Sequence, residues 1–353
     1  MKILQDLSLV ELKRELENLT PKMPRYRAEQ VFDWANNYVP FDEMSNIPQD
    51  LRNELKNSFI DIPVKIEKEL VSKDGTKKYL LSLSDGNIVE CVLMSYKYGN
   101  TICISTQVGC RMGCSFCATG IDGLIRNLTA GEMLGEVLAI NKANGGNRVD
   151  RKITNIVLMG CGEPLDNYDN VVKFIKLISS KEGLNISQRS ISLSTCGLAE
   201  KIKQLADEDL GITLTISLHA TTDEHRKKIM NIAKAVSLKE LFFAIKYYFE
   251  KTKRRIVFEY IELDMNTNPD DAKRIKELAK GLSYHINLIP INVTPNTEKN
   301  NPALKPPSKQ KSAEFWEELK KLGISATTRR TLGSDIAGAC GQLRRSTIQG
   351  GKK

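Results

Sequence analysis

Hydrophobic positions in the first sixty residues recur every three or four residues, which is the period of an amphipathic helix. Ser8 and Glu11 have the spacing of an N-terminal capping box, and Pro48 suits the first turn of a helix. We therefore expect a helix after Ser8, a second over YRAEQVFDWANNY and a third over PQDLRNELKNSF.

The hydrophobic period then changes to two, which is typical of half-buried strands. Three alternating runs follow one another, IEKELV, KKYLLSL and NIVECVLM. The tripeptides between them, KDG at 73–75 and SDG at 84–86, contain the Asp-Gly pair that favours tight hairpin turns. These residues predict an antiparallel β meander.

From about residue 100, β-branched runs alternate with amphipathic segments such as TAGEMLGEVLAINKAN and SLKELFFAIKYYFEK. The runs are TICIST, ITNIVLM, RSISLST, ITLTISL, RRIVFEYI and YHINLIP. Strands that alternate with helices indicate βα units and a parallel sheet. Six units are too few for a closed eight-stranded barrel, so we expect an α/β fold with an open, partial (βα)6 barrel of the TIM type.

These patterns divide the chain into four parts. We expect a small helical accessory domain over residues 1–62, the antiparallel meander over 63–95, the barrel core over 96–335 and a basic tail over 336–353. No internal repeat and no low-complexity tract interrupts this order.

The composition is that of an ordinary globular protein, because 41% of the 353 residues are hydrophobic and 27% are charged. A disordered or fibrous chain is thereby excluded. No stretch approaches the roughly 18 consecutive apolar residues that indicate a transmembrane helix. The N-terminal residues lack the apolar core of a secretory signal, so we expect a cytoplasmic protein that does not associate with membranes.

Basic residues exceed acidic ones, with 52 lysines and arginines against 43 aspartates and glutamates and a net charge of +9. Such an excess suits a polyanionic partner such as nucleic acid, and it is equally compatible with a surface that only keeps the protein soluble. The chain also has eight cysteines. Because disulfides are rare in the cytosol, these thiols point to metal or redox chemistry.

Three cysteines are concentrated as Cys110-x-x-x-Cys114-x-x-Cys117, in the loop after the first strand of the predicted barrel. Three thiolates can bind three irons of a four-iron cluster and leave the fourth iron open to a substrate. A structural zinc site, the main alternative, usually needs four nitrogen or sulfur ligands, and the sequence has no second cysteine pair. Cys103 is the candidate fourth ligand if the cluster is instead fully ligated.

The predicted strands end in, or are followed by, residues that can bind a ligand: Gly162, Glu163, Ser194, Ser217, His219 and Asn292. In barrels of parallel strands, functional residues gather at the carboxyl ends of the strands. Gly162 permits a close approach of the backbone to a ligand, and Glu163 can accept hydrogen bonds from an ammonium group. Each residue alone could be a cap or turn residue, but the set predicts one site.

The cysteine loop, following the first strand of a partial (βα)6 barrel, resembles the signature of radical S-adenosylmethionine (SAM) enzymes. The surrounding residues ICISTQVGCRMGCSFCATG resemble the RNA adenine methyltransferases of the RlmN/Cfr type. The same family resemblance continues, in order, through GCGEPLDN, SLSTCG, SLHA, INLIPIN and DIAGACGQL. These blocks extend the resemblance over nearly the whole chain.

The resemblance implies two cofactors. Cys110, Cys114 and Cys117 would bind a [4Fe-4S] cluster with one open iron, and two SAM molecules would be used in each turnover. The contacts to SAM would come from Gly162, Glu163, Ser194, Ser217, Leu218, His219 and Asn292.

The resemblance also implies a reaction in which a 5'-deoxyadenosyl radical activates a methyl group carried by Cys340 as S-methylcysteine. Glu90 would accept a proton, and Cys103 would resolve the protein–RNA adduct through a transient disulfide with Cys340. From the residues alone, Cys340 could be a small buried hydrophobe, Cys103 a structural strand residue and Glu90 a solvated carboxylate. Gly338, Gly341 and nearby arginines around Cys340 instead favour a reactive thiolate in a flexible tail.

The implied substrates are adenine 2503 of 23S ribosomal RNA and adenine 37 of some transfer RNAs, each methylated at carbon 2. The helical domain and the basic tail would hold RNA through its phosphates. A flavodoxin- or ferredoxin-type electron donor and a monomeric enzyme are expected as well.

Three alternatives remain: a C8 methyltransferase of the same family, which confers antibiotic resistance, a radical SAM enzyme without RNA, and a non-enzymatic iron–sulfur protein that binds RNA. Pro164 favours the C2 enzymes, since the C8 branch tends to have alanine at this position. Cys161, Cys196 and Ala337 depart from the family's usual residues without removing a group that the reaction needs.

Overall fold

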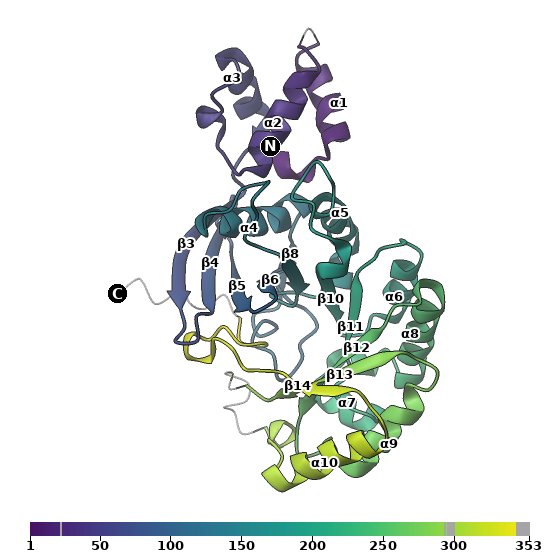
Figure 1. The fold of residues 1–353 in the computed structure, drawn as a ribbon. Helices are drawn as coiled ribbons and strands as arrows, with labels where there is room; N and C mark the ends of the chain where they lie inside the picture. The colour runs from purple at the N-terminus through teal and green to yellow at the C-terminus, as the bar shows by residue number, and fades with distance from the viewer. Residues whose placement is uncertain (22, 293, 295–300, 344–353) are drawn as a thin grey trace.

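A ten-stranded mixed sheet runs through the molecule, with helices packed along it (Figure 1). The computed structural model describes residues 1–21, 23–292, 294 and 301–343. In spatial order the strands are β14 (Ala326–Thr328), β13 (Tyr284–Pro290), β12 (Ile256–Glu262), β11 (Thr213–Ser217), β10 (Ile191–Thr195), β9 (Asn155–Leu158), β6 (Gly99–Ile104), β5 (Ile88–Tyr96), β4 (Lys77–Leu83) and β3 (Val64–Val71).

The seven strands from β6 to β14 in this order are parallel to one another, as βα units require. Figure 1 shows α6 and α8 on the outside of the curved sheet. The helices of this part are α4 (Ala130–Ala143), α5 (Tyr168–Ile178), α6 (Ala199–Ala206), α7 (Asp223–Ile229), α8 (Leu238–Thr252), α9 (Pro269–Leu278) and α10 (Lys309–Lys321). The predicted α/β class with an open, partial barrel is confirmed.

Each of the six predicted core strands is present, and within the ten-stranded sheet the sequence pattern missed only β14. This strand is three residues long and pairs with β13, with Ala326 opposite Ile286. Three residues are too few to show an alternating pattern, so the parallel neighbour alone gives this segment its extended conformation.

The predicted meander forms as β3, β4 and β5, which pair in antiparallel fashion. Strand β5 also pairs with β6, so the meander continues directly into the parallel sheet (Figure 1). Most of β3 is exposed, whereas β4 and β5 are almost entirely buried. One sheet therefore connects residues 63–95 with the barrel.

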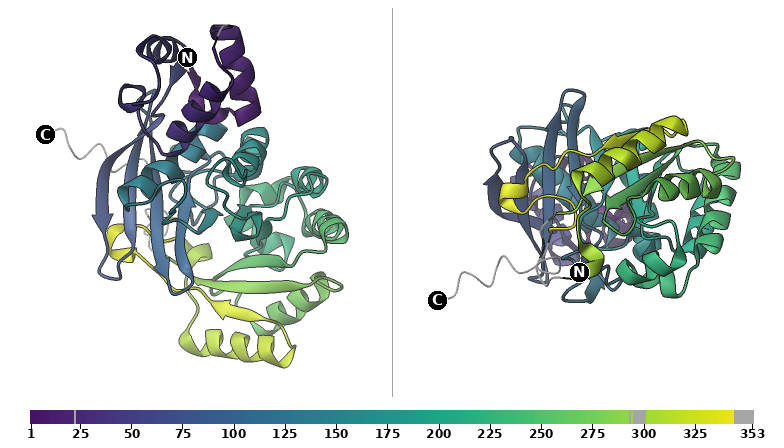
Figure 2. Two further views of the ribbon diagram at one scale, coloured as in Figure 1. Left: turned by 45° about the horizontal axis from the view of Figure 1, so that its top comes forward. Right: turned by 90° about the horizontal axis from the view of Figure 1, so that it is seen from below.

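The first sixty residues fold as α1 (Leu9–Leu19), α2 (Tyr26–Asn36) and α3 (Gln49–Ser58). A short parallel pair, β1 (Lys2–Ile3) with β2 (Phe59–Ile60), joins the two ends of this unit. The helices enclose a hydrophobic cluster of their own, separate from the barrel core. Figure 2 shows the unit packed at one end of the barrel.

Helix α4 is buried because the barrel sheet and the N-terminal unit cover it; its residues 130–141 are all buried. Two glycines permit the close packing. A Cβ at Gly131 would lie 2.6 Å from the backbone nitrogen of Asp6, and one at Gly135 would lie 2.9 Å from Cγ2 of Val64. The N–H of Gly131 donates a 2.6 Å hydrogen bond to the Asp6 carboxylate, at the positive end of the helix dipole.

No helix of the described residues is long and apolar enough to span a membrane.

The contact at Gly131 predicts a measurable cost of substitution. Gly131→Ala should lower the free energy of unfolding by about 1–3 kcal/mol, because the new methyl group overlaps the backbone of the N-terminal unit. Gly211→Ala is the matched control, since its Cβ would make an ordinary 3.4 Å contact with Gln188 and should change stability by less than about 0.5 kcal/mol. Urea unfolding of both variants checks this. Equal stabilities would show that the N-terminal unit does not depend on this contact.

Candidate active site

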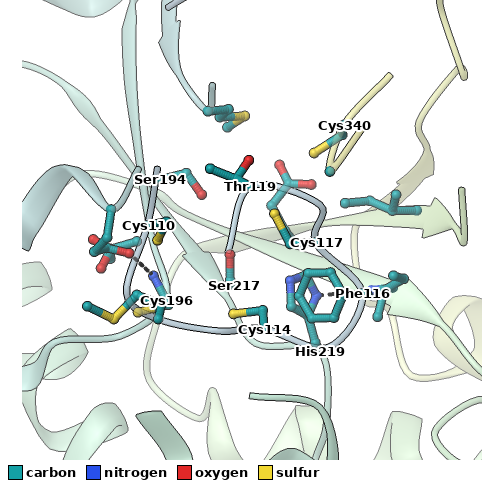
Figure 3. A pocket seen from close by; sticks show the side chains of 18 of the residues that line it. Cys110, Cys114, Phe116, Cys117, Thr119, Ser194, Cys196, Ser217, His219 and Cys340 are labelled. Atoms are coloured by element: carbon teal, nitrogen blue, oxygen red, sulfur yellow. Dashed lines mark hydrogen bonds between the residues drawn. The ribbon is translucent and has the colours of Figure 1, made fainter. Parts of the chain in front are cut away.

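A cavity of about 150 Å³ opens where the parallel strands end (Figure 3). Its walls come from the ends of β9 to β13, from the loop of residues 110–120 and from residues 329–343. We call residues 110–120 the cysteine loop and residues 329–343 the C-terminal segment. The predicted site residues that line it are Cys110, Cys114, Cys117, Gly162, Glu163, Ser194, Ser217, His219, Asn292 and Cys340. Residues from six separate segments of the sequence therefore converge on one space.

The cysteine loop lies between two short antiparallel strands, β7 (Gln107–Gly109) and β8 (Leu124–Asn127). The N–H of Cys110 donates a 2.9 Å hydrogen bond to the carbonyl of Gly123, which closes the base of the loop. Gly109 has a φ of +78°, and a Cβ there would lie only 2.0 Å from the same carbonyl. Glycine is thus required immediately before the first cysteine.

Two further segments hold the loop from outside. The N–H of Ser115 donates to the carbonyl of Ile229 at the end of α7, at 2.9 Å, and the Asn231 amide donates to the carbonyl of Gly113 at 3.1 Å. The N–H of Ala118 donates a 2.8 Å hydrogen bond to the carbonyl of Gly341 in the C-terminal segment. The loop is therefore fixed by residues more than one hundred positions away along the chain.

The donor set of the loop fits an iron–sulfur cluster. Its three thiols line one cavity, whereas no three His, Cys, Asp or Glu side chains of the described residues converge as for a single metal ion. A cluster binds its thiolates through separate iron atoms, so such convergence is not needed. Burial raises the pKa of the Cys110 thiol to about 12 and that of Cys114 as well. Cys110 and Cys114 are therefore protonated at neutral pH, and a metal must displace their protons.

Glu163 is buried beside the loop, and its carboxylate is already bound on the protein side. One oxygen accepts from the N–H of Leu165 at 3.0 Å, and the other accepts from the N–H of Cys196 at 2.7 Å. Burial raises the pKa of Glu163, and these hydrogen bonds oppose the shift. Each carboxylate oxygen has a second acceptor site, so a cationic ligand in the cavity can still be bound.

His219 lies two residues after the end of β11, and its backbone has the left-handed conformation, with a φ of +55°. Its Nδ1 accepts a hydrogen bond of 3.1 Å from the N–H of Ile261, and its ring meets that of Phe116 edge to face at 4.9 Å. Burial and the charge of Arg226 lower the pKa of His219 to about 3. The imidazole is therefore neutral, with its remaining proton on Nε2.

Leu218 differs from the other predicted SAM contacts, because its fully buried side chain does not line the cavity. Its N–H donates to the carbonyl of Glu259 at 3.1 Å, and its own carbonyl accepts from Nε of Arg226 at 3.3 Å. Both backbone groups are thus engaged within the protein.

Cys340 is exposed and lines the cavity, but the described part of the chain around it is anchored rather than a flexible tail. The carbonyl of Cys340 accepts from the Asn292 amide at 2.9 Å. The Asp335 carboxylate accepts a 2.6 Å hydrogen bond from the hydroxyl of Ser72, in the turn between β3 and β4. The expectation of a flexible tail is therefore wrong for residues up to 343, and Arg344 onward lies outside the described residues.

The expected lowering of the Cys340 pKa is also wrong in its net direction. Desolvation raises the pKa of the Cys340 thiol, while the guanidinium of Arg329 lowers it and the Glu259 carboxylate raises it. The arginine thus lowers the pKa against a larger effect of desolvation of the thiol where it faces the cavity.

Cys103 lies on β6, buried behind the cavity in a cluster with Val92, Met94 and Leu343 of the C-terminal segment. Burial and the nearby Cys340 thiol raise the pKa of Cys103 to about 12. Both cysteines are free thiols in this structure. The fold thus places Cys103 within electrostatic range of Cys340, although the two residues are more than two hundred positions apart.

Glu90 is not the solvated carboxylate that the strand pattern alone suggested. It forms a 2.9 Å ion pair with Lys78, and both side chains are 3% exposed or less. Lys78 also donates to the carbonyl of Ala337 at 3.1 Å, which connects this pair to the C-terminal segment. Glu90 does not line the cavity that holds the cysteine loop but borders a smaller space with Thr119 and Cys161.

The sequence analysis missed two charged residues of the cavity wall, Glu259 on β12 and Arg329 after β14. Their charges lie 3.5 Å apart, and the Asn287 amide donates to the other Glu259 oxygen at 3.0 Å. The available signal was a carboxylate within the apolar run RRIVFEYI, where a buried charge needs a partner. Cys196, named above only as a departure from the family's usual residues, lines the cavity directly.

The partial barrel, the three-cysteine loop and the ring of polar residues define a radical SAM enzyme. The model of the radical SAM superfamily matches residues 104–254, and that of the ribosomal RNA large subunit methyltransferase N-terminal domain matches residues 4–60. A solved radical SAM methyltransferase from Sphaerobacter thermophilus is 40% identical, with a TM-score of 0.90 over 98% of this chain and 100% of that chain.

Two curated relatives extend along nearly the whole length. The "Probable dual-specificity RNA methyltransferase RlmN" of Clostridium perfringens strain 13 is 50% identical over 99% of this chain and 98% of its own length. The protein of the same name from Clostridium beijerinckii is 48% identical over 99% of this chain and 96% of its own. The chain belongs to the RlmN family of radical SAM RNA methyltransferases. Membership implies SAM and a [4Fe-4S] cluster as cofactors.

The position of Arg329 predicts the reactivity of Cys340. Because this guanidinium lowers the thiol pKa, Arg329→Met should raise it and slow alkylation of Cys340 by iodoacetamide at pH 8 about threefold or more. The rate should keep rising with pH beyond the range where an ordinary thiol levels off, since the folded-state pKa lies above the usual value. Peptide mass spectrometry of the metal-free protein measures this. Arg330→Met, the exposed neighbour, is the control, and an equal slowing there would contradict the assignment.

Proposed function

We propose that this protein methylates carbon 2 of an adenine in 23S ribosomal RNA and of adenine 37 in some transfer RNAs, with two SAM molecules per turnover. One observation carries the proposal: a single cavity joins the three cluster thiols, the polar strand ends and Cys340. Each group alone would suit several functions. Together they provide a cluster site, a SAM site and a nucleophile that can reach the same small space.

Cys110, Cys114 and Cys117 would hold the [4Fe-4S] cluster, which leaves one iron open to SAM. When bound, the cluster would supply the electron for reductive cleavage of SAM, a chemistry that side chains lack. Glu163 would accept the SAM ammonium group with its free acceptor sites. Ser194, Ser217, His219 and Asn292 would provide the other polar contacts, with His219 as a neutral donor.

Cys340 is the methyl acceptor in this proposal. Its sulfur forms a bond to the methyl carbon as the bond between that carbon and the SAM sulfonium breaks, so the thiol must first lose its proton. Arg329 favours this thiolate by lowering its pKa. The exposure of Cys340 toward the cavity leaves the sulfur accessible to SAM first and to the RNA base later.

Cys103 would release the product. Its thiolate attacks the Cys340 sulfur, the S–S bond forms, and the bond from that sulfur to the RNA-linked carbon breaks. The electron pair stays with the carbon, which takes up a proton and becomes the methyl group of the product. The contact of Cys103 with Leu343 places this thiol against the C-terminal segment that carries Cys340.

Glu90 would accept the proton that the adenine loses, with Lys78 as its counter-charge. The N-terminal helices and the basic excess of the chain would hold RNA through its phosphates. We further propose a monomeric cytoplasmic enzyme that receives electrons from a flavodoxin- or ferredoxin-type donor. Pro164, which lines the cavity, supports carbon 2 over carbon 8 by the family resemblance.

The product tests this proposal directly. Ribosomal and transfer RNA from a strain that lacks the gene should gain 2-methyladenosine after incubation with the reconstituted enzyme, SAM and a reductant. Mass spectrometry of the digested nucleosides identifies the position of the methyl group. A Cys340→Ala enzyme treated identically is the control and should give none. Detection of 8-methyladenosine instead would assign the chain to the C8 enzymes, and no methylated adenosine at all would contradict the proposal.

The two cysteines should fail at different steps. Cys340→Ala should neither gain a methyl group nor join to RNA, because the nucleophile is absent. Cys103→Ala should still be methylated at Cys340 and should accumulate as protein covalently joined to RNA, because no thiolate can form the disulfide. A nuclease-sensitive shifted band on a denaturing gel reveals the adduct. Turnover of Cys103→Ala at the parent rate would remove the resolving function from Cys103.

A further inference from the structure

Arg226, on α7, is a buried cation to which the reaction described above assigns no function. Its side chain is 0% exposed, and it is the largest fully buried side chain of the described residues. No carboxylate forms an ion pair with it in the part of the chain that the structure describes. A buried charge normally requires an opposite charge.

The guanidinium is only partly satisfied by neutral acceptors. Nη2 donates to the carbonyl of Cys196 at 2.6 Å and, more weakly, to that of Ser217 at 3.4 Å, and Nε donates to that of Leu218 at 3.3 Å. Nη1 is buried and has no hydrogen-bond partner. Three carbonyl dipoles do not neutralise a full charge, so the described residues leave this guanidinium without an anionic partner.

Arg226 lies on the helix that holds the cysteine loop: α7 ends at Ile229, whose carbonyl accepts the N–H of Ser115 in that loop. Cys114 belongs to the same apolar cluster as Cys196 and Ile229. The guanidinium of Arg226 donates to the carbonyl of Cys196, and Ile229 follows Arg226 by one turn of α7. The charge of Arg226 also acts on the Cys114 thiol, lowering its pKa against a larger effect of burial. Figure 3 shows Cys114 and Cys196 on one side of the pocket, with Cys340 on the other.

The acidic groups nearby are engaged elsewhere. The Glu163 carboxylate accepts from the N–H of Cys196, whereas Arg226 donates to the carbonyl of that residue, so the two charges are held on different backbone groups. Asp223, on the same helix, accepts from the N–H of Leu238. Glu163 also faces the cavity, where it is available to a cationic ligand. Neither carboxylate pairs with the guanidinium.

We propose that Arg226 is the resident counter-charge of the iron–sulfur cluster held by Cys110, Cys114 and Cys117, an inference that rests on the proposed function. Three thiolates carry more negative charge than an oxidised [4Fe-4S] core balances, and reduction adds one more electron. A fixed positive charge in a low-dielectric site therefore stabilises the reduced state more than the oxidised state. Arg226 is thus a positioning and tuning residue that acts through the cluster.

The reduction potential of the cluster tests this inference. In reconstituted protein without SAM or RNA, Arg226→Gln should make reduction about tenfold less favourable, a shift of about 59 mV to lower potential for one electron. Glutamine keeps hydrogen-bond donors for the carbonyls but removes the charge. Arg226→Lys should restore most of the parent potential. Lys227→Gln removes an exposed charge from the same helix and should leave the potential unchanged, because solvent screens it.

A redox titration followed by electron paramagnetic resonance measures the potentials. An Arg226→Gln potential equal to that of the parent would overturn the inference. A shift that appears only after SAM is added would overturn it as well, because the counter-charge would then serve the SAM carboxylate. Parent protein that binds no cluster, or Cys114→Ala protein that keeps its full iron, would instead contradict the proposed function itself.

Unfolding of the metal-free protein gives a second measurement. Without the cluster, Arg226 is an unpaired buried charge, so Arg226→Gln should cost the metal-free chain less stability than it costs the cluster-bound chain. An equal loss in both forms would show that the guanidinium is only a structural clamp and would overturn the inference. A metal-free Arg226→Gln chain that does not fold would overturn it for the same reason.

Discussion

The position of the cysteine loop depends on backbone hydrogen bonds that reach it from separate parts of the chain. The carbonyls of Gly123, Ile229 and Gly341 each accept an N–H from the loop. The loop contains little regular structure of its own, so these bonds decide where its thiols lie. They also connect the thiols to α7, which carries Arg226, and to the C-terminal segment, which carries Cys340.

Around this loop the protein concentrates charge in a buried environment. The Glu163 carboxylate accepts from the N–H of Cys196, and the Arg226 guanidinium donates to the carbonyl of the same residue. Glu259 forms an ion pair with Arg329 near Cys340. Buried charges are costly unless they are paired or bind ligands. We therefore interpret the unpaired charge of Arg226 and the remaining acceptor sites of Glu163 as preparation for charged cofactors rather than as a source of stability.

Much of the fold was predictable because it depends on local periodicity. The six core strands, the meander and the three N-terminal helices all carry hydrophobic patterns of the right period. Strand β14 was not predictable, because its three residues are extended only through pairing with β13. The burial of α4 could not be predicted from the sequence either. It arises because the N-terminal unit and β3 pack closely against the helix at Gly131 and Gly135.

The sequence by itself determined the chemistry that is available: three cysteines with the spacing of a cluster loop and polar residues at the strand ends. Spacing along a loop or strand is a local property that can be read from the chain. Only the tertiary structure decided which distant residues join them, namely Arg226, Glu259 and Arg329, and that Glu90 is paired with Lys78. Burial and charge pairing depend on contacts between segments, and these exist only once the sheet and its loops have been assembled.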